Sequence, residues 1–293
     1  MLVGKIAITG ATGQLGSLVI GHLLDKGVPA DEMVAVVRNL EKANPLKQKG
    51  LTIRHGDYED GQSLVEAFTG IDKLLFISSP SWDNTHRIKQ HATVVEAARD
   101  AKVNHIVYTS IAFPHEMTLG LEHVHLATEH AIKTTEMIYT FLRNGFYMDL
   151  LVNPGLEAMI QSGEIITSTS GGKLNYVTRD NLALAAATVL TETDHENQVY
   201  ELVNPNLFTY DQLAAILTDL SGKEVKHRDL PPEEAYRQLI RSGVPEGDAA
   251  FMVHGVFNSI AQGQFSHTSD DLRKLIGDRI TTVESAVKQV LSK

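Results

Sequence analysis

The 293-residue sequence contains no cysteine. Disulfide bonds, thiolate nucleophiles and thiolate metal ligands are therefore excluded. The sequence also lacks a run of the ~18 apolar residues that a membrane span requires. Its first residues, MLVGKIAITG, lead directly into a predicted strand and show no cleavage site of a signal peptide. These absences favour a cytoplasmic protein.

Basic residues are in the minority: 26 Lys and Arg stand against 36 Asp and Glu, which gives a formal net charge of −10. The chain thus lacks the basic composition that is typical of nucleic-acid-binding proteins. Hydrophobic residues make up 43% and charged residues 21% of the chain, as is usual in globular proteins. The length suits one large α/β domain, alone or with a smaller lobe.

The first half of the chain alternates short apolar runs with segments of helical spacing. The runs are continuous rather than alternating in polarity, which indicates parallel strands that are buried on both faces. Repeated strand–helix–strand units predict an α/β fold with a doubly wound, mostly parallel sheet of the Rossmann type. The predicted strands cover residues 5–9, 33–37, 51–55, 73–77, 105–109 and 137–142.

The rhythm changes after about Asn144. We expect a helix over 180–192, a strand over 199–203, a helix over 209–222, a further strand within EVKHRDL, and mostly helices after it. We therefore divide the chain into a dinucleotide-binding domain (1–150) and a smaller, mixed and mainly helical lobe (151–293). The boundary is approximate because the chain is expected to cross back to the sheet.

A glycine-rich loop, ITGATGQLG, joins the first predicted strand to the first helix. Gly10 allows the tight turn, Gly13 allows the backbone to approach a pyrophosphate, and Gly16 allows close packing of helix and strand. The phosphates would lie at the helix N-terminus, where backbone N–H groups are free. The strand–loop–helix context makes this a dinucleotide-binding signature, with Gly10, Thr12, Gly13, Gln14 and Leu15 as the contacting residues.

The end of the second strand indicates which dinucleotide is bound. Folds that prefer NAD place an acidic residue there for the ribose 2′-hydroxyl, whereas this chain has VVRN, with Arg38. A guanidinium suits a 2′-phosphate, and Asn39 is placed to add a hydrogen bond. The sequence therefore predicts NADP(H). The alternative is an exposed arginine without a ligand.

Two further segments end predicted strands at the edge where open α/β sheets bind ligands. Asp57 and Tyr58, in HGDYED, are expected near the adenine. Ser78, Ser79 and Pro80, in FISSP, are expected near the ribose and nicotinamide.

These segments together resemble the NmrA-like group of atypical short-chain dehydrogenases, and within it the triarylmethane dye reductases and type 2 quinone reductases. The residues that carry the resemblance are ITGATGQLG, VVRN, RHGDYED, KLLFISSP, HVHLATEHAI, YTFLRNGFY and SGKEV. They extend from residue 6 to beyond residue 220. No one of them is specific alone, but the set is.

The resemblance implies an NADPH-dependent reductase of a small aromatic acceptor, and it is compatible with a homodimer. It implies that Asn144, Gly145 and Phe146 border the nicotinamide. The acceptor would lie between the sheet edge and the C-terminal lobe. Its candidate wall consists of Trp82, Phe113, His125, Tyr147 and Met148, each of which has core packing as its alternative.

Many related reductases carry Tyr-x-x-x-Lys where this chain has Leu126 and His130. Ketone reduction needs that proton donor, whereas a triarylmethyl cation or a quinone can accept hydride without it. We therefore assign no catalytic residue. We also assign no metal site, because His123, His125 and His130 lack the spacing of three or four that brings helical side chains together.

Two functions remain open. One is a reductase that transfers hydride directly to a quinone or a cationic dye. The other is a regulatory protein of the NmrA-like type that binds NADP without catalysis, since a sensor needs the same glycine loop and equally lacks the tyrosine. Fold alone does not decide between them.

Overall fold

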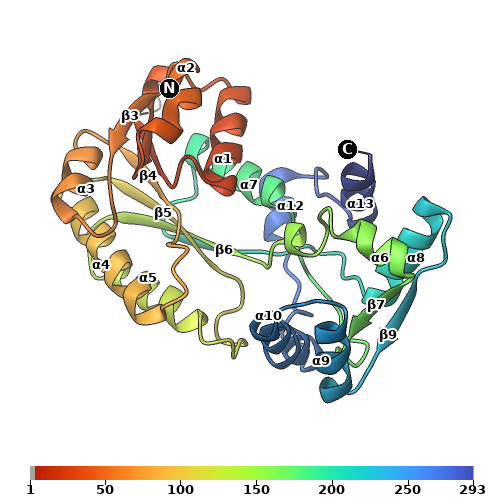
Figure 1. Ribbon diagram of the computed structural model, residues 1–293. Coiled ribbons are helices and arrows are strands. Elements are labelled where there is room, and N and C mark those ends of the chain that lie inside the picture. Colours follow the sequence, from red (N-terminus) through yellow and green to blue (C-terminus); the bar gives the residue numbers. More distant parts are fainter. Residues whose placement is uncertain (1–3, 293) are drawn as a thin grey trace.

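A seven-stranded sheet forms the centre of the larger of two lobes in the computed structural model, which describes residues 4–292 (Figure 1). All its strand pairs are parallel, and the order is β3-β2-β1-β4-β5-β6-β8. The strands are β1 (Ile6–Thr9), β2 (Met33–Val37), β3 (Thr52–His55), β4 (Lys73–Phe76), β5 (His105–Ile111), β6 (Ile138–Asn144) and β8 (Gln198–Leu202). The predicted doubly wound α/β fold is confirmed.

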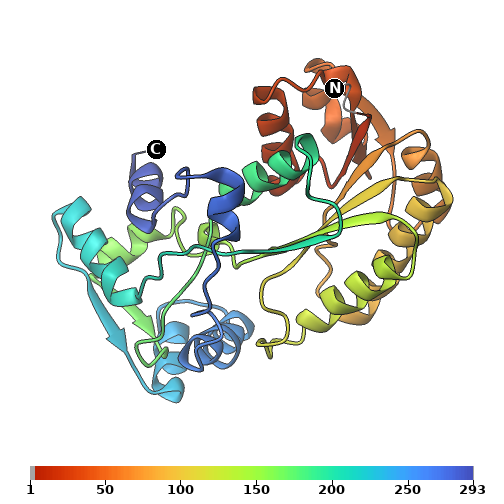
Figure 2. The ribbon, with the colours of Figure 1, turned by 180° about the vertical axis from the view of Figure 1, so that it is seen from behind.

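Helices cover both faces of this sheet, as the views from opposite sides show (Figures 1 and 2). One face packs against α1 (Gln14–Asp25), α7 (Arg179–Thr191) and α12 (Asp271–Ile276). The other packs against α3 (Gly61–Phe68), α4 (Asn84–Asp100) and α5 (Glu122–Lys133). Every residue of β1, β2 and β5 is buried, which explains why β1 and β2 are apolar at nearly every position.

The smaller lobe has its own core around a parallel pair of strands, β7 (Glu164–Thr167) and β9 (Lys226–Asp229). Short helices surround this pair (Figure 1). They are α6 (Leu156–Ser162), α8 (Tyr210–Ser221), α9 (Pro232–Arg241), α10 (Glu246–Ala250), the π-helix η4 (Phe251–Phe257), α11 (Asn258–Ala261) and α13 (Val283–Leu291). The remaining short elements are η1 (Ala30–Glu32), η2 (Glu41–Ala43), α2 (Asn44–Gln48) and η3 (Met148–Leu150).

The chain enters the smaller lobe and then returns to the larger one. After α6 and β7, helix α7 packs against α1 and strand β8 pairs with β6, and only then does the chain complete the smaller lobe. A division at residue 150 therefore leaves three elements of the large lobe, α7, β8 and α12, on the far side of the boundary. None of the helices within residues 4–292 has the length and apolar character to span a membrane.

Candidate active site

A cavity of about 500 Å³ opens at the carboxyl edge of the large sheet. Its position is the switch point of the topology, because β1 is flanked there by β2 on one side and β4 on the other. The predicted dinucleotide residues line it, apart from the three at the end of β6. The full lining is Gly10, Thr12, Gly13, Gln14, Leu15, Gly16, Val36, Val37, Arg38, Asn39, Lys42, Gly56, Asp57, Tyr58, Ile77, Ser78, Ser79, Pro80, Gln90, Tyr147 and Arg179.

The glycine loop presents bare backbone to this cavity. Gly10 has a φ of +58°, in the left-handed region that favours glycine. A side chain on Gly16 would bring its Cβ within 2.4 Å of the Gly10 carbonyl oxygen, so helix α1 can approach β1 only with glycine there. Gly13 is the N-cap of α1, with no side-chain cap and no acidic residue in the first turn. The first N–H groups of α1 are thus free to bind an anion.

Cations lie at the β2 end of the cavity. Arg38 is exposed directly after β2, and Lys42 adds a second positive charge to the lining. The side-chain oxygen of Asn39 accepts hydrogen bonds from the Glu41 and Lys42 backbone N–H groups, at 2.9 and 3.2 Å. Asn39 therefore shapes the turn that carries Lys42, and only its amide nitrogen remains for a ligand. The sequence analysis did not identify Lys42, although its spacing from Arg38 was visible.

Tyr58 reaches from the loop after β3 to the neighbouring strands. Its hydroxyl lies 2.6 Å from the Ile77 carbonyl oxygen and 2.7 Å from Thr9 Oγ1. Burial raises the pKa of Tyr58 well above its usual value. This tyrosine is consequently a wall of the cavity and a tie between strands, and its hydroxyl keeps its proton at neutral pH.

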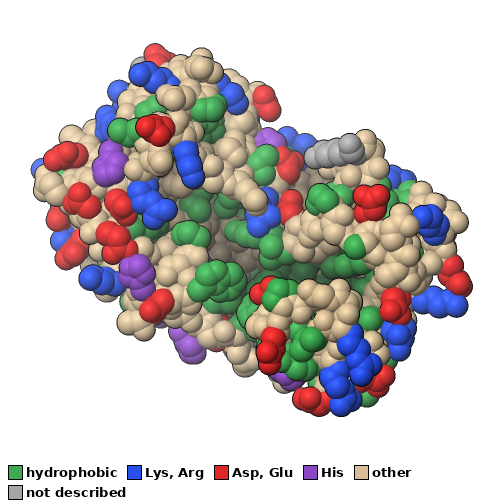
Figure 3. All heavy atoms as spheres, viewed as in Figure 1, with side chains coloured by type: hydrophobic (Ala, Val, Ile, Leu, Met, Phe, Trp, Pro, Cys, Tyr) green, Lys and Arg blue, Asp and Glu red, His purple; other side chains and the backbone are tan. Residues whose placement is uncertain are grey.

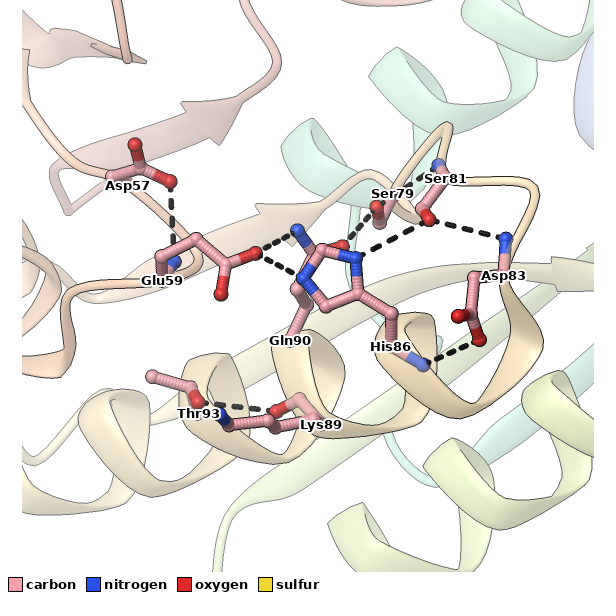
Figure 4. A network of polar contacts seen from close by, with 9 residues as sticks. All are labelled: Asp57, Glu59, Ser79, Ser81, Asp83, His86, Lys89, Gln90 and Thr93. Carbon is pink, nitrogen blue, oxygen red and sulfur yellow. Dashed lines mark hydrogen bonds and ion pairs between the residues drawn. The ribbon is translucent and has the colours of Figure 1, made fainter.

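A polar network fixes the loop after β4 against the loop after β3 (Figure 4). Gln90, on α4, accepts a hydrogen bond from Ser79 Oγ and donates one to the Glu59 carboxylate. His86 Nε2 lies 2.6 Å from the same carboxylate. The hydrogen bond from Gln90 is the largest of the effects that lower the pKa of Glu59. The network sets the position of Ser79, and it was not foreseen because three separate segments contribute to it.

Tyr147 and Arg179 close the cavity on the side of the smaller lobe. The guanidinium of Arg179 lies 4.1 Å from the centre of the Tyr147 ring and 3.6 Å from Asp149. Burial raises the pKa of Tyr147. Tyr147 was predicted to contact the acceptor, whereas Arg179 was missed because it begins a helix that was assigned to the other lobe.

The three predicted nicotinamide residues line a second, narrower space of about 10 Å³ between the lobes. Asn144, Gly145 and Phe146 meet Phe113, Asn175, Gln264 and Phe265 there. We call this space the inter-lobe slot. A Cβ on Gly145 would lie 3.1 Å from the Leu202 carbonyl oxygen, so the close passage of β8 leaves little room for a side chain there. The side-chain oxygens of Asn144 and Asn175 are buried there and have no hydrogen-bond partner within residues 4–292.

Phe113 has a φ of +47°, which is unusual for a large residue. Its N–H donates to Glu201 Oε2 at 2.8 Å. Glu201 pairs in turn with Arg143, and Arg143 forms a two-bond pair with the buried Glu129, at 2.9 and 2.7 Å. A buried ionic network thereby holds the floor of the inter-lobe slot.

Two exposed aromatic rings meet at the boundary of the lobes. Trp82, from the loop before α4, is 89% exposed, and Phe251, from η4, is 48% exposed. Their ring centres are 6.0 Å apart in an edge-to-face arrangement. A space-filling view shows the hollow between the lobes with hydrophobic side chains gathered in it (Figure 3). Exposed rings at such a position are typical of a binding surface.

Two residues of the predicted acceptor wall lie elsewhere. Met148 is fully buried in the core of the smaller lobe. His125 is 5% exposed, and its Nδ1 lies 2.8 Å from the Tyr108 hydroxyl beneath the sheet edge. Burial lowers the pKa of His125 well below its usual value, so its ring is neutral at neutral pH. Both positions depend on the orientation of a helix or turn, which residue type alone does not specify.

Leu126 and His130 were compared above with the Tyr-x-x-x-Lys pair of other reductases. Leu126 is partly buried and His130 is exposed, both on α5. Lys133 lies over the rings of Tyr139 and Phe141, at 5.6 and 5.5 Å from their centres. Within residues 4–292, no three His, Asp or Glu side chains are placed to hold a metal ion.

Comparison with known proteins agrees with this geometry. The NmrA-like family model matches residues 3–290. Quinone oxidoreductase 2 from Escherichia coli K12 is 39% identical over 287 residues, which cover 98% of this chain and 99% of that protein. The solved structure of Citrobacter sp. triphenylmethane reductase with NADP(H) has a TM-score of 0.93 and 53% identity, over 98% of this chain and 99% of that one. The E. coli quinone oxidoreductase with NADPH has a TM-score of 0.89 and 39% identity, over 98% and 100%. The chain belongs to the NmrA-like family.

Proposed function

We propose that the protein is an NADPH-dependent oxidoreductase that passes a hydride directly to a small aromatic acceptor, a quinone or a triarylmethane dye. One observation carries the proposal. A single cavity joins the glycine loop, Arg38 and the residues next to the lobe boundary. Two proteins similar to this chain are named as a quinone oxidoreductase and a triphenylmethane reductase.

The residues of the cavity fit NADP(H) along its length. The free N–H groups of α1 suit the pyrophosphate, and Arg38 with Lys42 suits the 2′-phosphate. Asp57 and Tyr58 would border the adenine, and Ser78, Ser79 and Pro80 would border the nicotinamide, with Asn144, Gly145 and Phe146 on its other side. When bound, the cofactor supplies the hydride, and the protein supplies position and exclusion of water.

The acceptor would lie where the cavity meets the smaller lobe. Trp82, Phe113, Phe251 and Tyr147 offer aromatic surface for a planar ring system. Orientation of donor and acceptor can lower a barrier by ~7–11 kcal/mol in favourable cases. We assign no proton donor on α5, because a quinone or a dye cation requires none at the moment of transfer.

Loss of NADPH absorbance tests the proposal. With menadione or malachite green added, NADPH should be consumed in proportion to the acceptor. Deuterium at the transferred position of NADPH should appear on the central carbon of the reduced dye. NADPH that binds but is not oxidised by any acceptor in a quinone and dye panel would favour the sensor function instead.

Trp82 gives a second measurement, because it is the only tryptophan in the chain. A planar acceptor stacked against it should quench its fluorescence, with or without turnover. Leu150 is 61% exposed, and Leu150→Ala is the control for a general surface effect. In this variant the acceptor should still quench the fluorescence of Trp82. Unchanged emission at saturating acceptor would remove Trp82 from the acceptor site.

A further inference from the structure

Arg87 is a cation without a partner close to the proposed acceptor site. It lies on α4, is half-buried, and its Nε is buried with no hydrogen-bond partner among the described residues. Its charge lies near two tyrosines, Tyr108 and Tyr147. Arginine stays protonated at neutral pH. An unpaired, partly buried charge is costly unless a ligand completes it.

The neighbours of Arg87 along α4 border the proposed acceptor site. Gln90, three residues later and on the same side of the helix, lines the dinucleotide cavity. The start of α4 meets the region beside the smaller lobe, since Asn84 Nδ2 donates to the Gly120 carbonyl oxygen at 3.2 Å. Trp82, which touches Phe251, lies just before the helix. Along the chain, Arg87 therefore lies between Trp82 at the lobe boundary and Gln90 at the cavity.

The anionic groups expected of the cofactor lie elsewhere. The pyrophosphate fits the N-terminus of α1, and the 2′-phosphate fits Arg38 and Lys42 at the far end of the cavity. Glu59, the nearest carboxylate of the α4 network, is already paired with Gln90 and His86. A further anion would form on the acceptor during the reaction, and it would complete the charge of Arg87.

We propose that the guanidinium of Arg87 binds the acceptor oxygen on which negative charge develops, so that the site favours quinones over cationic dyes. The inference rests on the proposed function and adds its substrate class. A quinone gains two electrons and one proton as a hydride from the nucleotide, and it takes a second proton from water. Between these events one oxygen is an anion, which a charge-assisted hydrogen bond stabilises. A dye cation becomes neutral and gains nothing from Arg87.

The test compares the two acceptors in Arg87→Met and Arg87→Lys. Charged hydrogen bonds are worth enough to predict a loss of roughly tenfold to a hundredfold in kcat/KM for menadione in Arg87→Met. The same variant should reduce malachite green at an unchanged or higher rate, and Arg87→Lys should recover part of the menadione rate. Arg99→Met is the matched control, because Arg99 is exposed on the same helix and pairs with Asp100.

A second readout needs no turnover. 4-Nitrophenol, whose colour reports its ionisation, should bind to the NADP⁺ complex as the phenolate, with a lowered pKa that Arg87→Met abolishes. NADPH affinity should stay within about twofold. An equal loss with both acceptors, an unchanged menadione rate, or a parallel loss of NADPH binding would overturn the assignment. If the unmodified protein reduces neither acceptor, the proposed function fails, and the nitrophenol titration still decides the role of Arg87.

Discussion

Acid should destabilise the protein through His91, a residue that couples the cavity to the core. His91 is 1% exposed on α4. Its Nε2 accepts the Ser79 N–H at 2.9 Å, and its Nδ1 lies 2.8 Å from Thr128 Oγ1, a hydroxyl that donates to the Val124 carbonyl oxygen. The ring is therefore held neutral, with its proton on Nδ1. A second proton on Nε2 would face the Ser79 N–H.

The magnitude follows from the pKa. Burial lowers the pKa of His91 from 6.5 to about 3. Between these two pKa values the unfolded chain binds a proton at His91 that the folded protein does not bind. The free energy of unfolding is therefore highest above pH 6.5 and falls as the pH drops toward 3. Each pH unit in this window costs about 1.4 kcal/mol, so pH 5 removes roughly 2 kcal/mol through this residue. A domain has only about 5–15 kcal/mol in all.

Urea unfolding followed by circular dichroism at pH 6.5 and pH 5 measures the effect. His91→Gln should reduce the pH slope by this amount, even though the variant is less stable at both values. His130→Gln, which changes an exposed histidine, is the control. His105, whose pKa burial lowers to about 4, adds a loss of the same sign and remains in both variants. Carboxylates titrate mainly below pH 5, the lower of the two values compared. Equal slopes in His91→Gln and the unmodified protein would refute the reasoning.

Three further outcomes follow from the site. NADPH should bind more tightly than NADH, and Arg38→Ala should remove roughly tenfold or more of that preference, as measured by titration. Gly13→Val should abolish NADPH binding. The fold should be retained, because the new Cβ would meet only the Gly10 carbonyl oxygen, at 3.1 Å. Gly16→Ala should instead lower the thermal midpoint, because its Cβ would lie 2.4 Å from the same oxygen. Arg143→Met should cost about 3–5 kcal/mol in urea unfolding by leaving Glu129 buried and unpaired, and Glu129→Gln in the same chain should restore part of it.

The sequence predicted the large lobe well because its signals are local. Continuous apolar runs identify buried parallel strands, and the glycine loop has a fixed relation to the strand and helix that it joins. Gly10, Gly13 and Arg38 thus fall on one cavity. The smaller lobe was predicted only in outline: β7 was not foreseen, since EIIT is short, and the π-helix η4 has no periodicity that distinguishes it from an α-helix.

The acceptor side was harder to predict because it depends on contacts between distant segments. His125 is a histidine, a residue type that can transfer protons in a pocket, yet its side of α5 faces Tyr108. Arg179 reaches Asp149 and the Tyr147 ring from a helix that begins 30 residues after Asp149. That Arg87 Nε has no hydrogen-bond partner among the described residues becomes clear only once the contacts of its neighbours are known. Residue type shows what a side chain can do, and only the packing shows what it faces.

The return of the chain through α7 and β8 has a consequence for the order in which the protein is completed during synthesis. Until residue 202 has left the ribosome, β6 is an unpaired strand edge, and until residue 191 has emerged, the outer side of α1 is uncovered. Such edges bind other chains readily. The N-terminal lobe of many proteins folds first as a unit, but here it must wait for segments made after the first elements of the smaller lobe. A fragment that ends at residue 150 would retain the glycine loop and still expose both surfaces.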